Sequence, residues 1–305
     1  MSPIITALIP IAGVIALGWG LRRTGLVRTE LWAGVNRLSY QALLPALLFS
    51  TISTAQLEGA EAGPFLIAAT LGFLAMGAIA LAFKSLPVDG PAYTSLFQGA
   101  VRWNGFVLLA LAGAVFGTEG AALAALVFAP TVPLINIMCV AVLTIWGASE
   151  VSPDVRRVAF RIITNPLILA CLAGAAANAL NLFQTGPVAD TAALAGRAAL
   201  PLILLAIGAG LDFSALKARP ALLALSVSLK LIVAPAVFYA LGLAFGLDGL
   251  ALVLVTAIGA TPGAAASYVL ASEMGGDARL MAGHVTATTV AAFIALPVWI
   301  GVAGG

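Results

Sequence analysis

The sequence predicts an all-α polytopic membrane protein, because its composition, its charge-free segments and its loop charges all favour this fold class. The chain has 305 residues, of which 62% are apolar and only 9% are charged, whereas soluble domains carry about 25% charged residues. Its mean hydropathy is +1.12. So few charges could not cover the surface of a soluble domain of this length. The composition therefore excludes a soluble enzyme, a nucleic-acid-binding protein and a disordered chain.

Ten segments are apolar and long enough to be expected to cross a bilayer as helices, which takes about 20 mostly apolar residues. Most of them hold no charge at all, and the exceptions contain only Arg102, Arg197 and Lys230. The connections between them are short and leave no room for a soluble domain. The predicted spans are residues 1–21, 38–57, 62–83, 90–118, 120–149, 162–189, 191–211, 220–247, 249–272 and 280–305.

The loop charges predict the orientation of these spans. Basic residues gather in the odd-numbered loops, whereas the even-numbered loops carry acidic residues instead. Cytoplasmic loops are enriched in Lys and Arg, so we expect both termini on the non-cytoplasmic side. The basic residues include Arg22, Arg23, Arg28, Lys84, Arg156, Arg157, Arg161, Lys217, Arg219 and Arg279, and the acidic ones are Glu58, Glu61, Asp190 and Asp248.

The two halves of the chain match weakly, which predicts an internal repeat. Leu44-Pro45 corresponds to Leu200-Pro201, and Gly120 corresponds to Gly276. Because each half has an odd number of spans, the second half must be inverted relative to the first, as in many secondary carriers. The expected organisation is a first five-helix repeat at 1–148, a cytoplasmic connecting loop at 149–160 and a second, inverted five-helix repeat at 161–305.

The ninth span contains Thr261-Pro262-Gly263 halfway along. Proline removes a backbone donor and clashes with the preceding turn, and glycine lets the chain open. The freed backbone groups would need partners inside the protein or in a watery cavity. This pattern predicts either a functional helix break or an ordinary proline kink.

The fourth span contains Arg102 and Asn104, also near its middle. An arginine at the bilayer centre costs roughly 2.5–3.5 kcal/mol even on the lenient insertion scale. Arg102 could therefore line a transport site, or it could lie at a shallow depth and extend its charge to the interface. Asn104 offers a donor and an acceptor for a substrate.

Other polar residues within the spans are further candidates. Lys230 in the eighth span faces the same choice as Arg102, and Asn136 in the fifth span could line a cavity. His284, the only histidine, could titrate near neutral pH, but a lone histidine there is more often a packing residue. Since the spans contain no deep acidic residue, a cavity holding Arg102 and Lys230 would favour an anionic substrate.

No nucleotide-binding, zinc-hydrolase or serine-hydrolase motif is present in the sequence. We therefore expect no enzyme activity, no cofactor, no metal site and no nucleic-acid partner. Transport work would have to come from an existing gradient, and the membrane potential supplies about 2.3 kcal/mol per charge per 100 mV.

Three segments together resemble the auxin efflux carrier family, which includes plant auxin exporters and bacterial carriers of malonate-type acids. These segments are GLVRTELWAGVNRLSYQALLPALLFSTIS with Asn36-Arg37 and Pro45, then QGAVRWNGFVLLALAGAVFG, and Pro262. The resemblance implies ten helices in two inverted repeats, with helices 4 and 9 broken and crossing at the substrate site. It would place Asn104 and Pro262 at the crossing and Asn136 beside it. One departure is the run 106–111 after Asn104, which lacks the usual glycine and proline.

The expected function is a secondary transporter that moves small organic anions, such as dicarboxylates or auxin-like acids, by alternating access. The predicted substrate-binding residues are Asn104, Arg102, Thr261, Pro262, Asn136 and Lys230. The alternative is a sodium- or proton-coupled symporter or antiporter of the related bile-acid-carrier-like fold. Membrane lipid is an expected partner, and a coupling ion and a homodimer are left open. Because arginine and alanine are abundant, a GC-rich bacterial genome and its inner membrane are expected.

Overall fold

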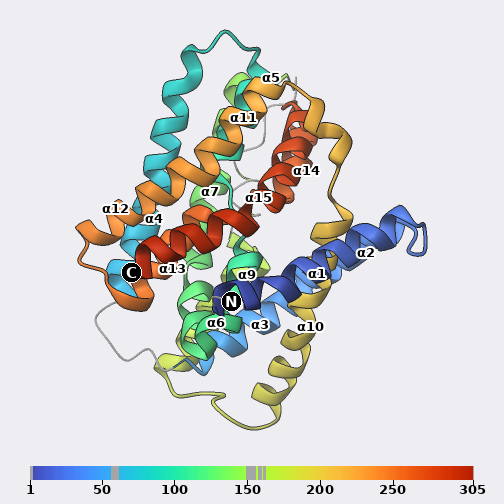
Figure 1. Ribbon diagram of the computed structural model, residues 1–305. Coiled ribbons are helices and arrows are strands. Elements are labelled where there is room, and N and C mark those ends of the chain that lie inside the picture. Colours follow the sequence, from blue (N-terminus) through green and yellow to red (C-terminus); the bar gives the residue numbers. More distant parts are fainter. Residues whose placement is uncertain (1–2, 56–61, 149–155, 157–159, 161–162, 305) are drawn as a thin grey trace. The chain divides into compact units, whose positions relative to one another are not determined.

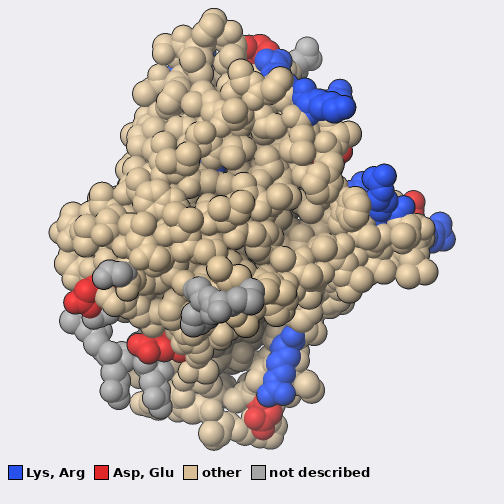
Figure 2. All heavy atoms as spheres, viewed as in Figure 1, with Lys and Arg blue, Asp and Glu red and all other residues tan. Residues whose placement is uncertain are grey.

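The computed structural model describes residues 3–55, 62–148, 156, 160 and 163–304 (Figure 1). In these residues the regular secondary structure is helical. Six helical stretches in this part of the chain are long and apolar enough to cross a membrane. They support an integral membrane protein. Pro166–Ala179 and Gly249–Ala260 are apolar but shorter, so the ten-span inverted repeat stays a prediction. Figure 2 shows one face on which charged side chains are sparse.

The chain divides into two compact units, and both take segments from each half of the sequence. Unit 1 consists of Met1–Gly59, Phe106–Ala129 and Val155–Gly210. Unit 2 consists of Ala60–Gly105, Pro130–Asp154 and Leu211–Gly305. Compact units are defined by packing and repeats by similarity along the chain. The units therefore do not test the repeat boundaries, which stay a prediction. Most of the expected connecting loop at 149–160 lies outside the described residues, as do Glu58, Glu61, Arg157 and Arg161.

Unit 1 is held together by close packing between long helices. Helix α10 packs against both α1 and α3, and α3 packs against α9. A side chain at Gly18 or Gly208 would collide with the backbone of the opposite helix, because small residues let α1 and α10 approach closely. The helices are α1 Pro3–Arg23, α2 Thr29–Leu38, α3 Leu44–Ser53, α6 Gly105–Leu126, which begins in unit 2, α9 Pro166–Ala179 and α10 Pro187–Ala209.

The second helical stretch begins earlier than the predicted span at 38–57. It starts with α2 at Thr29 and passes through a π-helical turn, η1 Ser39–Leu43, into α3. Pro45 lies at the start of α3 and cannot donate a backbone hydrogen bond to the preceding turn. The wider π-turn accommodates this loss without ending the helix.

Unit 2 contains the remaining helices and all six residues predicted to bind substrate. Phe73 on α4 packs against Phe238 on α12 and against Trp103, with ring centroids 5.0 Å and 5.7 Å apart. The elements are α4 Ala62–Ala82, η2 Phe83–Ser85, α5 Gly90–Val101, α7 Phe128–Trp146, which begins in unit 1, η3 Phe213–Lys217, α11 Pro220–Ser228, η4 Leu229–Val233, α12 Ala234–Ala244, α13 Gly249–Ala260, α14 Ala266–Glu273 and α15 Ala278–Gly304.

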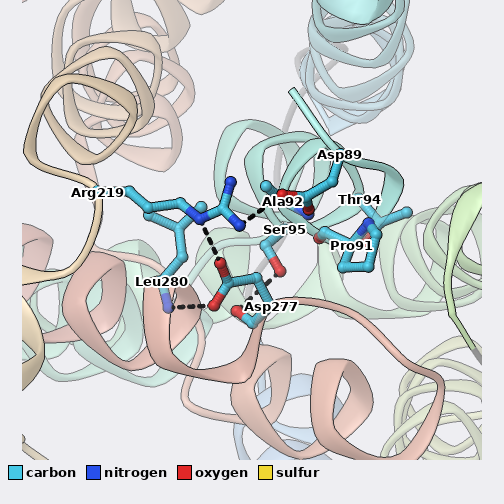
Figure 3. Close-up of polar contacts among 8 residues, drawn as sticks. All are labelled: Asp89, Pro91, Ala92, Thr94, Ser95, Arg219, Asp277 and Leu280. Carbon is cyan, nitrogen blue, oxygen red and sulfur yellow. Dashed lines mark hydrogen bonds and ion pairs between the residues drawn. The ribbon is translucent and has the colours of Figure 1, made fainter. Parts of the chain in front are cut away.

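Three loops of unit 2 meet in an ion-paired cluster (Figure 3). Arg219, which precedes α11, pairs with Asp89 before α5 and with Asp277 before α15, the latter with 3.0 Å between Nε and Oδ2. The Ser95 hydroxyl donates to the Asp277 carbonyl at 3.0 Å. These contacts bring the third, seventh and ninth predicted loops to one end of unit 2, as expected if all three face the same side of the membrane.

Candidate functional site

Two helices of unit 2 stop in the middle of a predicted span, and they stop in the same way. Helices α5 and α13 each have 12 residues and each follow an aspartate, Asp89 or Asp248. The last helical hydrogen bond is donated by Arg102 to Gln98 in α5, at 2.8 Å, and by Thr261 to Ala257 in α13, at 3.0 Å. Both of these donating residues are extended, with ψ near 138° and 153°. The predicted breaks in the fourth and ninth spans are therefore present.

The two interruptions touch each other through the backbone. The Asn104 N–H donates to the Pro262 carbonyl at 2.8 Å, and the Gly263 N–H donates to the Thr288 hydroxyl on α15 at 3.0 Å. Backbone groups released from a helix inside a membrane protein must find such partners. The contact thus joins the fourth and ninth predicted spans at their breaks, where the crossing was expected.

Helices α5 and α13 reach the interruptions from opposite ends of unit 2. Asp89, just before α5, is paired with Arg219, just before α11. The stretch α11–η4–α12 leads away from that end, and α13 starts after the turn that follows α12. The C-terminal ends of α5 and α13 therefore face each other. Their last carbonyl groups and the extended residues Arg102 and Thr261 lie near the middle of the unit.

The first interruption contains a buried guanidinium group. Arg102 is 8% exposed, so it does not extend to the surface of unit 2. Its Nη2 donates to the Asn136 Oδ1 on α7, whereas its buried Nε has no hydrogen-bond partner in the part of the chain that the structure describes. Among the described residues, no acidic side chain forms an ion pair with it. Two predicted site residues, Arg102 and Asn136, are therefore in direct contact.

Lys230 is also buried, and its place follows from a second π-turn. It lies in η4, just before Pro235 near the start of α12, and it is only 1% exposed. The described part of the chain gives its amine no ion pair. This burial excludes the alternative in which Lys230 extends to the surface of unit 2. Burial of an amine without an acidic partner is costly.

His284 belongs to this region, although the sequence favoured a packing role for it. Its Nδ1 lies 2.8 Å from the Ser226 Oγ on α11. Its ring fills the space beside Gly99 on α5 and Gly263 in the second interruption, where a Cβ would come within 3.0 Å and 2.6 Å of ring nitrogens. Its buried Nε2 has no partner among the described residues. The signal that could have found it was Gly263 itself, because a glycine beside a break leaves room for a large neighbour.

Two other polar residues have clear positions. The Thr261 hydroxyl donates to the Ile258 carbonyl in its own helix at 2.7 Å, so it closes the end of α13. Gln98 on α5 is completely buried, and neither its Nε2 nor its Oε1 has a partner in the described part of the chain. Unpaired buried amides are rare, which makes Gln98 a candidate site residue that was not among those predicted.

The family comparison agrees with this geometry. Residues 3–300 match the model of a family described as membrane transport protein, and the chain belongs to this family, which is the auxin efflux carrier family. The match covers nearly the whole chain, so the protein is a membrane transporter. The comparison with curated proteins gives no match.

Proposed function

We propose that this transporter carries small organic anions, chiefly carboxylates, and that it does so by alternating access. The observation that carries the proposal is the buried Arg102 guanidinium, which lies at a helix interruption with an unused Nε donor and no acidic partner among the described residues. A planar guanidinium matches the geometry of a carboxylate. A substrate carboxylate would supply the missing negative charge and the missing acceptor.

The surroundings of Arg102 support an anion over a cation. Lys230 adds a second buried basic group to the same unit. Helix α14 begins at Ala266, just past the second interruption. The positive end of its helix dipole favours negative charge nearby. A cation as the main cargo would instead call for deep carboxylates.

The predicted site residues would divide the work as follows. Arg102 would bind the carboxylate. Asn136 would orient the guanidinium in the empty site and would then give up this hydrogen bond to contact the substrate. Asn104 would offer its side-chain amide, while Thr261 and Pro262 would hold the second interruption open. Lys230 would balance charge within the unit.

The direction and the setting of transport are also part of the proposal. The ion-paired loops at one end of unit 2 support the expected orientation, with both termini on the non-cytoplasmic side of a bacterial inner membrane. An electrical gradient provides about 2.3 kcal/mol per charge per 100 mV, which is adequate for driving a monovalent anion outward. A sodium- or proton-coupled symporter or antiporter is the alternative, and ion dependence of the flux would reveal it.

The test is transport in proteoliposomes with radiolabelled malonate, succinate and indole-3-acetate. Wild-type protein is expected to carry at least one of these acids, and Arg102→Ala is expected to lose tenfold or more of that flux, since about 1.4 kcal/mol of binding corresponds to tenfold in affinity. Arg197→Ala is the matched control, because Arg197 on α10 is exposed. Normal flux in Arg102→Ala, or no flux of any of the three acids in wild type, would refute the proposal.

A further inference from the structure

The His284 ring contacts both interrupted stretches of unit 2. Its ring lies against Gly99 on α5, three residues before Arg102, and against Gly263 in the second interruption. One turn further along α15, Thr288 accepts the Gly263 N–H at 3.0 Å. A change in the charge or position of the ring would therefore affect both interruptions.

The hydrogen bonding of His284 leaves one nitrogen available. Nδ1 contacts the Ser226 hydroxyl, which can donate or accept, and Nε2 is buried with no partner among the described residues. A neutral imidazole carries one proton and an imidazolium carries two. If the Ser226 hydroxyl turns to accept from Nδ1, the ring can hold a proton on each nitrogen without losing its existing contact.

The charges around His284 oppose the binding of a second proton to the ring unless a negative charge is added nearby. Burial of the ring opposes a further positive charge, and so does Lys230 on η4, which packs against α15. Among the described residues, the neighbouring elements bring no acidic side chain to the ring. Glu273 and Tyr268 on α14 and Lys217 on η3 are exposed, and the Asp212 carboxylate is bonded to Ser214. Helix α13 has no charged residue, and the α5 and α11 contacts with the ring are Gly99 and Ser226.

We propose that His284 is the group that couples anion transport to a proton, taking up a proton from solvent on Nε2 when a carboxylate occupies the interruptions. This inference rests on the proposed anion transport, and for its energy source it adopts the proton-coupled alternative named there. The anion offsets the field of Lys230, so anion and proton bind together. When the site opens to the other side, the carboxylate leaves and the proton returns to solvent there. Each cycle thus moves one anion and one proton in the same direction. For a monovalent anion this cycle carries no net charge, so the proton gradient drives it in place of the electrical gradient considered above.

Proteoliposomes containing a trapped pH-sensitive dye test the coupling, with malonate, succinate and indole-3-acetate as probes and protein-free vesicles to subtract passive entry. In wild type, anion entry is expected to acidify the lumen. A pH difference of one unit is expected to raise steady-state accumulation by up to about tenfold for one coupled proton. Anion flux that ignores pH and leaves the dye unchanged would overturn this inference but not the proposed function, whereas absence of flux for all three probes would overturn both.

Variants assign the effect to the histidine. His284→Gln keeps a hydrogen-bonding partner for Ser226 but cannot carry the extra proton, so anion exchange at equal pH is expected to persist while acid-driven accumulation and the dye signal are lost. Persistence of exchange also reports that the variant is folded. Thr286→Val is the matched control on α15, and it is expected to keep acid-driven accumulation. Retained acid-driven accumulation in His284→Gln would overturn the inference.

A second variant keeps the inference testable if His284→Gln does not fold. Lys230→Gln removes the opposing charge, so the pH at which flux is half-stimulated is expected to move upward, by up to about one pH unit for a tenfold change in proton affinity. An unchanged pH profile in a folded, exchanging Lys230→Gln protein would also count against proton binding at His284.

Discussion

The two helix interruptions of unit 2 share a backbone geometry but not a cause. The second one follows from local sequence, because Pro262 cannot donate a hydrogen bond and restricts Thr261 to an extended conformation. The first one contains no proline. Arg102 leaves the helix there while its guanidinium contacts Asn136 and the Asn104 N–H contacts Pro262. The first interruption therefore depends on tertiary contacts, including one with the second.

This difference separates two tasks within one site. The second interruption supplies shape, through a proline, a glycine and a threonine hydroxyl that bonds its own helix. The first supplies charge and hydrogen-bonding capacity, through Arg102 and the groups around it. Changes to the second interruption should therefore damage the structure of unit 2 as a whole, and changes to the first should act mainly on substrate affinity.

The largest effect is expected from Gly263→Ala. A Cβ at this position would lie 2.6 Å from the His284 Nε2, and such overpacking costs about 1–3 kcal/mol of stability. Anion flux should be lost, and the thermal midpoint of the purified protein should fall. Gly301→Ala on α15 is the control, because nothing lies within 4 Å of a Cβ there. Equal behaviour of the two variants would show that the second interruption is not a structural element.

A smaller and more selective effect is expected from Asn136→Asp. The new carboxylate would give Arg102 a permanent acidic partner and compete with the substrate for the guanidinium. The KM for the carried acid should rise by about tenfold or more, while thermal stability stays close to that of wild type. Asn136→Gln keeps the amide and serves as the control. An unchanged KM in Asn136→Asp would mean that the substrate does not use Arg102.

The smallest effect is expected where the two interrupted stretches begin. Asp89 accepts the Ala92 N–H at 2.9 Å and pairs with Arg219, whereas Asp248 makes no capping bond. Asp89→Asn should cost about 0.2–1 kcal/mol, since the ion pair is half exposed. Asp248→Asn should cost less, and both costs can be read from thermal midpoints at neutral pH. A larger loss in Asp248→Asn would reverse this comparison.

The same aspartate gives a pH dependence of known sign. The hydrogen bond from Ala92, aided by Arg219, holds the pKa of Asp89 below its usual value against the opposing effect of burial. A carboxyl whose pKa is lowered by folding stabilises the protein above its unfolded pKa of about 4, and it loses that contribution as the pH falls through the folded pKa. Asp89→Asn should remove this part of the acid sensitivity, as measured by thermal midpoints between pH 6 and 3.

The local sequence predicted the second interruption through Pro262 and Gly263, whereas the first was implied only by the family resemblance. It left open whether Arg102 and Lys230 are interior groups or extend their charges to the interface, and their burial in the structure favours the interior. It did not predict the role of His284, because the partners Ser226 and Gly99 come from helices distant in sequence. The early start of α2 at Thr29 was missed because its polar residues do not resemble a membrane span.

The arrangement into compact units also lay beyond the sequence. Charge-free segments predict each helix separately. Which helices pack together depends on how well their surfaces fit, as where Gly18 lies against the backbone of α10. The weak repeat suggested a division at the middle of the chain, whereas the compact units draw on both halves. Repeats record similarity along the chain, and packing is decided afterwards by complementary surfaces.

The shortness of α14 has a consequence for how this protein opens. With eight residues, α14 is roughly 12 Å long and contains only about four internal backbone hydrogen bonds. It is the shortest α-helix in the described part of the chain, so its local melting breaks few bonds. Its amides should exchange with deuterium sooner than those of α13, on the other side of the same interruption. Unwinding of this single element would free the backbone that follows Gly263 without requiring any long helix to tilt.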